Sequence, residues 1–110
     1  MNINMFVKKE LIIFKNLSDE TRLGIVEFLL EGEKCVCEIF PKVKRTQSTV
    51  SIHLSILEEA GIVSSRREGK KVKYRIKDER VCRILRAAGN KKARRMEIGS
   101  CRKKYDGLVK

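Results

Sequence analysis

The sequence has 110 residues, of which 42% are hydrophobic and 5% aromatic, with no tryptophan. This length is typical of one domain, and the composition predicts a modest aliphatic core. No apolar run approaches the roughly 20 residues that span a bilayer, and the N-terminus lacks the pattern of a secretory signal peptide. We therefore expect a cytoplasmic protein that makes no membrane contact.

Positive charge is concentrated in one part of the chain. The formal net charge is +12, yet residues 1–65 carry eight Lys or Arg against nine Asp or Glu. Residues 66–110 carry eighteen against five. A one-sided basic field favours a polyanionic partner, most commonly nucleic acid. The alternative explanation is a solvated, lysine-rich tail.

The chain begins with two predicted amphipathic helices. Ile12 and Ile13 of the first helix form a second apolar surface, which a monomer would leave uncovered. The next helix is predicted over residues 19–31, with Ser18 or Asp19 as its N-cap. In the first helix, predicted within residues 6–17, the apolar residues at helical spacing are Phe6, Val7, Leu11, Phe14 and Leu17.

A short third segment and a longer fourth helix follow. Residues 35–43 form the third segment, where we expect Pro41 to disturb any helix that runs through it. The fourth helix is predicted over residues 46–60 and is closed by Gly61. Its buried side carries Val50, Leu54 and Leu57 at i, i+4 and i+7.

After Gly61 the apolar period changes from 3.6 to 2. Residues 62–67 and 72–76 alternate loosely around the turn at residues 68–71, which predicts a β-hairpin. A fifth helix begins near Asp78, with an apolar stripe at Val81, Ile84 and Leu85. The predicted fold is mostly α with a small β-hairpin, in a domain over residues 1–90. Residues 91–110 are predicted to be a basic and flexible tail.

The helices on either side of residues 44–46 fit a helix-turn-helix, and the hairpin after them fits a wing. Small hydroxyl side chains on the outer face of the fourth helix would let it lie deep in the major groove of DNA. There Gln47 can pair with adenine and the exposed Ile52 can contact thymine methyl groups. The candidate contacts on this helix are Gln47, Ser48, Thr49, Ser51, Ile52, His53 and Ser55. An ordinary solvated helix with incidental serines is the alternative.

The hairpin sequence RREGKKVKYRIK contains seven basic residues and one acid. Its tip can contact the phosphate backbone through Arg66, Arg67, Lys70 and Lys71, which adds affinity without reading the base sequence. His53 is the only histidine, and we expect it to pack against the core or touch a phosphate rather than bind a metal.

Several motifs resemble those of the ArsR/SmtB family of winged-helix repressors. The stretches are LSDETRLGIVEFLLEGEKCVCEI and QSTVSIHLSILEEAGIVSSRREGKKVKYRI, within residues 6–88. The resemblance implies a homodimer that pairs through its first and last helices and binds a palindromic operator in double-stranded DNA. It also implies a repressor that metal or metalloid ions release from DNA.

Cys35 and Cys37 match the metal motif of that family at its third helix. Thiolates are soft ligands for As(III), Sb(III), Cd(II), Pb(II), Zn(II) or Cu(I). With two thiolates alone, As(III) or Cu(I) is favoured and Zn(II) binds poorly. Because residues two apart in a regular helix point about 200° apart, a shared ion requires a distorted helix start. No ion is expected to be needed for folding.

The cysteine pattern departs from the family in several places. Phe40 stands where arsenic sensors add a third cysteine, and the N-terminal arm has none. The last-helix site of zinc and nickel sensors is absent, because Arg80 replaces the histidine paired with Asp78. Cys101 could supply a third thiolate from the tail, whereas Cys82 is interpreted as a small core residue.

The sequence is also compatible with other functions. The cysteines of an intracellular chain are expected to be reduced, metal-binding or redox-sensing. A thiol redox-sensing repressor and a ligand-independent winged-helix protein that binds DNA or RNA are the alternatives. We find no catalytic triad, phosphate-binding glycine loop or paired carboxylates, so we do not expect an enzyme.

Overall fold

The structure is a computed structural model that describes residues 8–95. Its order of elements confirms the predicted winged helix-turn-helix. The elements are α1 (Lys9–Leu17), α2 (Glu20–Leu29), β1 (Lys34–Cys35), α3 (Val36–Val43), α4 (Gln47–Glu59), β2 (Val63–Glu68), β3 (Lys71–Ile76), α5 (Arg80–Ala87) and α6 (Lys91–Arg94). None of the helices within residues 8–95 has the length and apolar character of a membrane-spanning segment.

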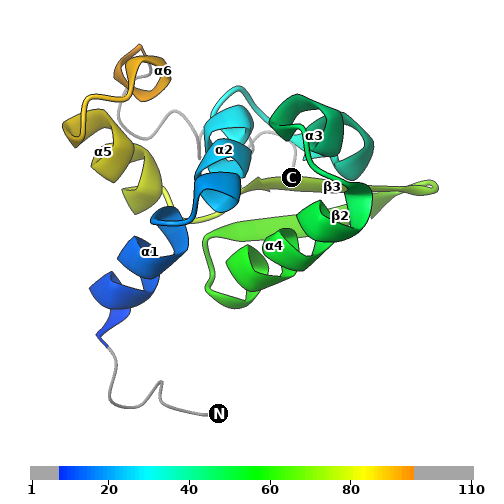
Figure 1. Cartoon of the computed structure of the whole chain (residues 1–110), viewed down its shortest axis with the longest axis horizontal. Coiled ribbons are helices and arrows are strands. Elements are labelled where there is room, and N and C mark those ends of the chain that lie inside the picture. Colours follow the sequence, from blue (N-terminus) through cyan, green and yellow to red (C-terminus); the bar gives the residue numbers. More distant parts are fainter. Residues whose placement is uncertain (1–7, 96–110) are drawn as a thin grey trace.

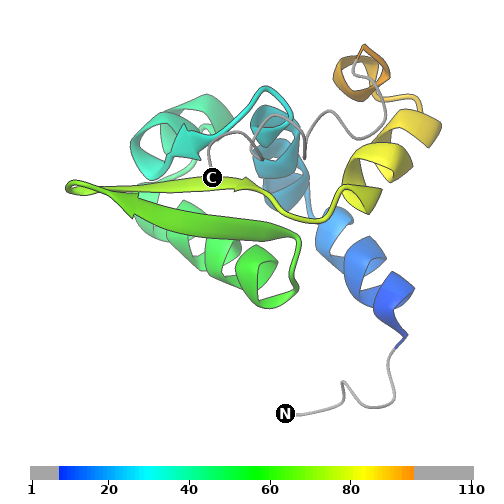
Figure 2. The ribbon, with the colours of Figure 1, turned by 180° about the vertical axis from the view of Figure 1, so that it is seen from behind.

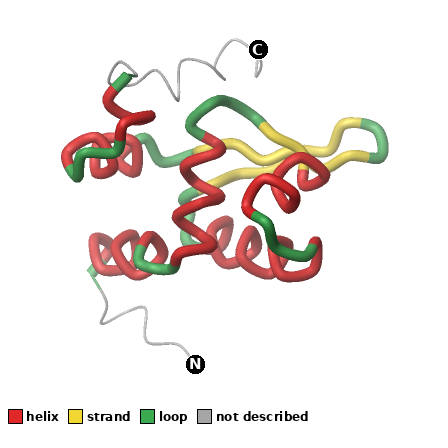
Figure 3. The backbone as a smooth tube through the Cα atoms, turned by 45° about the horizontal axis from the view of Figure 1, so that its top comes forward, coloured by secondary structure: helices red, strands yellow, loops and turns green. Residues whose placement is uncertain are grey.

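The β-hairpin and α1 lie at opposite ends of the molecule (Figure 1). Helices α2, α3 and α4 cover one face of the hairpin, whose tip extends beyond them (Figure 2). Helix α5 lies at the same end as α1, with α2 between this end and the helix-turn-helix (Figure 3). This layout separates the predicted DNA-reading elements from the helices expected to pair two subunits.

The sheet has three antiparallel strands in the order β1-β3-β2. In the hairpin, Val63 pairs with Ile76 and Glu68 with Lys71. The sequence did not predict β1, which pairs Lys34 with Tyr74 and Cys35 with Lys73. A strand of two residues is too short to show alternation, so only its pairing with β3 identifies it.

The core forms between the helices and the sheet, and it confirms the predicted buried side of α4. Val50, Leu54 and Leu57 are fully buried there. Val81 and Leu85 of α5 are also buried within this single chain, leaving Ile84 half-buried. Most of the α5 stripe is therefore used inside the monomer and is not free for a partner.

Helix α1 presents the opposite face from the one expected. Ile13 and Leu17 pack into the core, whereas Leu11 is 43% exposed and Phe14 is 53% exposed. The second apolar surface expected at Ile12 and Ile13 is thus largely internal. The surface left uncovered is the one that carries Leu11 and Phe14.

Pro41 was expected to disturb a helix in the third segment, and its effect is limited to one missing hydrogen bond. Helix α3 continues through Pro41 to Val43 and ends at Lys44, which has a left-handed backbone with φ of 59°. A proline removes only one backbone donor, and here it lies near the end of an eight-residue helix. The helix loses one hydrogen bond and continues for two residues beyond it.

The chain past Gly89 contains more structure than sequence periodicity indicated. Asn90 caps α6 by accepting a hydrogen bond from the backbone N–H of Ala93, whose side chain is buried. The side chain of Asn90 contacts Glu27 on α2, and that of Lys92 contacts Glu31 just after this helix. These contacts attach α6 to α2 and to the residues that follow it, whereas the rest of the predicted tail lies outside the described residues.

Candidate nucleic-acid interface and thiol pair

The turn between α3 and α4 is fixed by side chains on both sides. Thr46 caps α4 by accepting a hydrogen bond from the backbone N–H of Thr49 at 3.2 Å. Arg45 donates to the hydroxyl of Thr21 on α2 at 3.2 Å and to two backbone carbonyls of the turn. The orientation of α4 relative to α2 and α3 is therefore set by direct contacts, as a helix-turn-helix requires.

The outer face of α4 has the composition expected of a recognition helix. Gln47, Ser48, Ser51 and Ser55 are exposed, and Ile52 is 61% exposed. Thr49 is half-buried, and its hydroxyl accepts from that of Thr46 at 2.9 Å. This hydrogen bond makes the side chain of Thr49 part of the helix cap. Thr49 is therefore a weaker candidate for a base contact than the exposed residues.

His53 is half-buried at the edge of the buried face of α4. Its Nδ1 accepts a hydrogen bond from Arg22 at 3.1 Å, which leaves Nε2 to carry the proton of the neutral ring. Arg22 also donates to the backbone oxygen of Asn16 at 3.1 Å. His53 thus helps to join α4 to α1 and α2. Asp19 lies nearby, and the backbone N–H of Arg22 holds the pKa of this carboxyl below its usual value.

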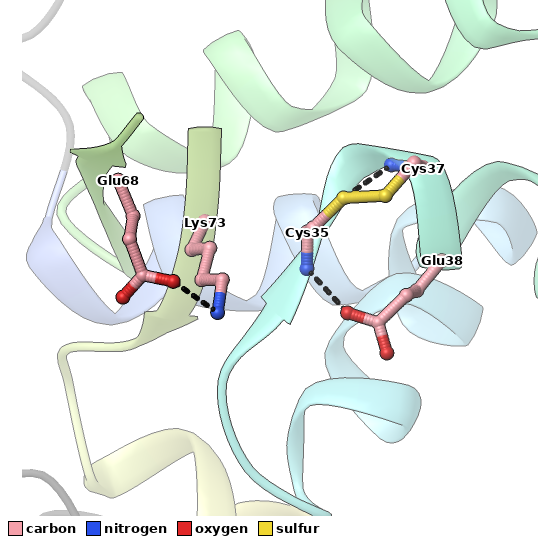
Figure 4. The surroundings of a disulfide bond; sticks show 5 residues. All are labelled: Cys35, Cys37, Glu38, Glu68 and Lys73. Carbon is pink, nitrogen blue, oxygen red and sulfur yellow. Dashed lines mark hydrogen bonds and ion pairs between the residues drawn. A yellow bond between two sulfur atoms is a disulfide. The ribbon is translucent and has the colours of Figure 1, made fainter. Parts of the chain in front are cut away.

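The four basic side chains predicted at the wing are not equivalent. Arg66 donates to both carboxylate oxygens of Glu33, at 2.8 and 2.7 Å, and to Glu68 at 3.0 Å. Lys73 contacts the other oxygen of Glu68 (Figure 4). These two cations, Lys73 foremost, lower the pKa of Glu68. Arg66 is therefore the weakest of the four candidates for a phosphate contact.

The other three wing cations face solvent. Arg67, Lys70 and Lys71 are exposed, and none of them forms an ion pair within residues 8–95. Gly69 makes the tight turn between the strands with φ of 63°. The tip of the wing consequently offers its charge to an external polyanion.

Cys35 and Cys37 lie at the junction of β1 and α3 (Figure 4). Cys35 is the N-cap of α3 and has an extended backbone, with φ of −80° and ψ of 154°. Its sulfur accepts a hydrogen bond from the backbone N–H of Cys37 at 3.0 Å. Cys35 precedes the first helical residue, and its side chain turns back over the helix. The separation of about 200° between residues two apart in a regular helix therefore does not apply to this pair.

Glu38 completes a capping box in which cysteine takes the usual place of serine or threonine. Its carboxylate accepts from the backbone N–H of Cys35 at 2.9 Å. The spacing C-x-x-E matches S/T-x-x-E, and this was the available signal for the helix start. Helix dipoles stabilise thiolates at such positions.

The sulfur atoms of Cys35 and Cys37 are joined in a disulfide. Cys82 is half-buried against the core, as predicted, and is also disulfide-bonded. Of the three expectations for the cysteines, reduced, metal-binding or redox-sensing, the reduced form does not describe this state of the molecule. The bond demonstrates that the side chains of Cys35 and Cys37 converge on one point.

Cys35 and Cys37 line a cleft of about 380 Å³ that is formed by residues of α3, α4 and the wing. Cys35 is 3% exposed, whereas Cys37 is exposed to solvent. Burial raises the pKa of Tyr74 in this cleft, and Glu58 adds to the effect. The lining residues are Cys35, Val36, Cys37, Gln47, Ser51, Lys70, Lys71, Val72 and Tyr74. The cysteines thus lie next to candidate DNA contacts.

The second metal position considered from the sequence is closed by an ion pair. Arg80 donates to both carboxylate oxygens of Asp78, at 3.0 and 2.7 Å, and this interaction lowers the pKa of Asp78. Across residues 8–95, no group of three or more His, Cys, Asp or Glu side chains could hold a metal ion. Cys101, the candidate third ligand, lies outside the described residues.

Sequence comparisons match regulators of transcription. The family model described as "Bacterial regulatory protein, arsR family" matches residues 19–65. An HTH-type transcriptional regulator of Methanocaldococcus jannaschii is 48% identical over 75 residues, covering 67% of this chain and 84% of that relative. The arsenical resistance operon repressor of Escherichia coli is 48% identical over 65 residues, covering 58% and 56%. A cadmium resistance transcriptional regulatory protein of Staphylococcus aureus is 43% identical over 77 residues, covering 69% and 64%.

The chain thus spans less than two thirds of the arsenic and cadmium regulators that it matches. Among solved structures, HlyU from Vibrio cholerae is similar with a TM-score of 0.69 and 30% identity, covering 80% of this chain and 94% of that one. A homodimeric winged helix-turn-helix DNA-binding domain from Mycobacterium bovis has a TM-score of 0.67 and 32% identity, covering 73% and 74%. These similarities agree with the architecture described above.

Proposed function

Because this chain belongs to the ArsR family of transcriptional regulators, we propose that it is a homodimeric repressor whose DNA binding is relieved by a soft metal or metalloid ion. Its operator is a palindromic site in double-stranded DNA, and its ion-binding residues are Cys35 and Cys37, with Cys101 as a candidate third ligand. The observation that carries this proposal is the convergence of the two sulfur atoms in a cleft shared with the recognition helix and wing.

DNA recognition is assigned to α4 and the wing. The exposed side chains of Gln47, Ser48 and Ser51 at the start of α4 would read base edges in the major groove, beside Ile52. Arg67, Lys70 and Lys71 would contact phosphates on either side. Ser55 lies farther along the same face, and His53 and Thr49 are supporting positions. In this division, α4 provides sequence specificity and the wing provides affinity for the DNA backbone.

The exposed apolar face of α1 supports pairing of two subunits. Leu11 and Phe14 are both more than a third exposed, and Ile84 of α5 is half-buried. Exposed apolar groups of this size favour a protein interface. A dimer would present two recognition helices about one turn of DNA apart, which matches a palindrome.

The position of Cys35 connects ion binding to DNA recognition. It pairs with Lys73 of β3 and also caps α3, which packs against α4. A change of bonding at this sulfur therefore reaches the wing and the helix-turn-helix directly. To release DNA effectively, the ion must favour the non-binding arrangement by a few kcal/mol.

The donor set fits a soft ion with low coordination number. Two thiolates suit As(III), Sb(III), Cd(II) or Cu(I) better than a hard cation. The arsenic and cadmium resistance regulators among the relatives carry names that agree with this class of ion. The disulfide favours a second candidate function, in which oxidation of the pair is itself the signal.

Fluorescence anisotropy on a duplex selected from a random pool tests the proposal. We expect the reduced full-length protein to bind tightly at low salt and to lose at least about tenfold in affinity with As(III), Cd(II) or Cu(I). If only oxidation weakens binding, the redox candidate is correct. If neither changes the affinity, the chain is a ligand-independent DNA-binding protein.

Two wing variants provide a matched test of the interface. Lys71→Gln should weaken binding to all sequences and reduce the slope of affinity against salt by about 1. Arg66→Gln should change that slope much less, because Glu33 and Glu68 already neutralise this side chain. Equal effects of the two substitutions would contradict this assignment of the wing.

A further inference from the structure

The two cysteines of the Cys35–Cys37 disulfide differ in their exposure to solvent. Cys35 is 3% exposed and is held over the start of α3, whereas Cys37 is exposed in the cleft. A nucleophile that enters from solvent therefore reaches the sulfur of Cys37 first. Attack at this atom makes Cys35 the leaving group.

The cleft around Cys37 has a strongly one-sided charge. Lys70 and Lys71 line it, and none of its nine lining residues is acidic. Gln47, Ser51 and Tyr74 add polar groups that can donate hydrogen bonds. Its volume of about 380 Å³ is within the range of small-molecule sites. This combination favours a small anion that also carries a group reactive toward a disulfide.

We propose that Cys37 is a site of mixed-disulfide formation with small anionic thiols, whose carboxylates are held by Lys70 and Lys71 in the cleft between the wing and α4. The step is thiol–disulfide exchange. The thiolate of the small molecule forms a bond to the sulfur of Cys37 while the bond between Cys37 and Cys35 breaks. Cys35 receives the electron pair and leaves as a thiolate, so no further oxidant or reductant is required.

The start of α3 assists this exchange. The sulfur of Cys35 already accepts a hydrogen bond from the backbone N–H of Cys37, and the dipole of α3 favours negative charge at this position. A stabilised thiolate is a better leaving group. The pair is therefore asymmetric, with an exposed sulfur that is attacked and a buried sulfur that departs.

The adduct would fill the space beside Gln47 and Ser51, and its carboxylates would neutralise Lys70 and Lys71. This consequence for DNA binding rests on the proposed function, whereas the exchange reaction itself does not. A thiol adduct would then exclude DNA from the cleft directly, without an allosteric change. The chemistry recognises any carboxylate-bearing thiol of suitable size.

Exchange kinetics test the site without DNA. The oxidised full-length protein is mixed with mercaptosuccinate, which is anionic, or with cysteamine, which is cationic. Each rate is normalised to the same thiol reacting with the neutral 2-hydroxyethyl disulfide. We expect the anionic thiol to react about tenfold faster at low ionic strength, and this preference to fall as salt screens the lysines. Acid quenching and fragment-ion sequencing of the tryptic peptide 35–42 should place the adduct on Cys37.

Matched variants identify the source of the preference. Lys70→Gln/Lys71→Gln should abolish it, whereas Lys15→Gln/Lys91→Gln removes two exposed charges outside the cleft and should preserve it. Equal normalised rates for the two thiols in the unmodified chain would overturn the proposal. An adduct on Cys35, or a preference that survives loss of both cleft lysines, would also overturn it.

A DNA-binding measurement separates this proposal from the proposed function. In Cys35→Ser, reaction with glutathione disulfide should give a stable adduct on Cys37. We expect this adduct to weaken duplex binding at least tenfold. If the unmodified protein binds no duplex, the proposed function fails while the kinetic result stands. If the adduct forms and DNA affinity is unchanged, the direct blockade is wrong.

Discussion

Two strand-to-helix junctions in this molecule carry a pair of polar or thiol side chains two positions apart. Cys35 and Cys37 lie at the junction of β1 with α3, and Asp78 and Arg80 lie at the junction of β3 with α5. In each pair the first side chain accepts a hydrogen bond at 3.0 Å from the backbone N–H of the second residue. At one junction the side chains are alike and can share an ion or a covalent bond. At the other they are oppositely charged and satisfy each other.

This contrast shows that spacing at a helix start does not by itself make a binding site. Asp78 and Arg80 neutralise each other, so an incoming cation would have to displace a guanidinium held by three hydrogen bonds. Cys35 and Cys37 hold no such competing partner once they are reduced. The chemistry of the two side chains, more than the backbone, decides whether the junction accepts a ligand.

The largest expected effect concerns ion binding at the two junctions. In the reduced protein, Cys37→Ser should lower As(III) affinity at least about 100-fold, because loss of even an outer partner of a ligand costs 10–100-fold. Asp78→Asn should leave that affinity unchanged. Competition with a chromophoric dithiol chelator would measure both constants, and an equal loss in the two variants would remove the distinction between the junctions.

A second test compares the structural contribution of each accepting side chain. Asp78→Ala should destabilise the fold by about 1 kcal/mol, because the backbone N–H of Arg80 loses its acceptor. Chemical denaturation of the reduced protein would measure this. Glu79→Ala is the control at the same junction, since the Glu79 side chain makes no cap hydrogen bond. A control variant that is equally unstable would show that Asp78 has no special role.

The cap of α3 can be separated from its sulfur chemistry. Cys35→Ala should cost about 1 kcal/mol of unfolding free energy in the reduced protein, whereas Cys35→Ser should cost less than about 0.5, since serine is a good N-cap. Both variants should lose the response to soft ions. Thermal unfolding followed by circular dichroism provides the comparison. Equal stability of the two variants would mean that the sulfur does not act as a cap.

The smallest effect is a pH dependence at the Asp78 junction. Arg80 lowers the pKa of Asp78 below its value of 3.8 in an unfolded chain. The resulting stabilisation is complete above the unfolded pKa and is lost as the pH falls through the folded pKa. Asp78→Asn should therefore show a shallower loss of stability below about pH 4. Thermal unfolding at several pH values would measure this. The same loss of stability at acid pH in the unmodified protein and in Asp78→Asn would contradict the charge pairing.

Periodicity predicted the helices well where one face is strongly apolar. The sequence placed the fourth helix at residues 46–60, and α4 spans Gln47–Glu59 with its predicted buried residues inside. It failed for α1, where two apolar faces were available along the same helix. The choice between Ile13 and Phe14 depends on how α1 packs against α2, which local spacing does not encode.

The site was predictable to the extent that its contacts are local. The capping role of Cys35 follows from residues within three positions, although the substitution of cysteine for serine concealed it. The pairing of Arg66 with Glu33 joins residues 33 positions apart, so the sequence could not show that this wing cation is neutralised. The approach of Lys71 to Cys37 likewise depends on the pairing of β1 with β3.

Cys35 ends β1 and also caps α3, so no connecting residue separates the strand from the helix. A single inserted residue here would shift either the pairing with Lys73 or the start of the helix, since no loop could absorb it. The hairpin turn at Gly69 is exposed and does not join a strand directly to a helix, so it should accept added residues far more readily. Changes in chain length among descendants of this sequence should therefore accumulate at the wing tip and be excluded from the thiol junction.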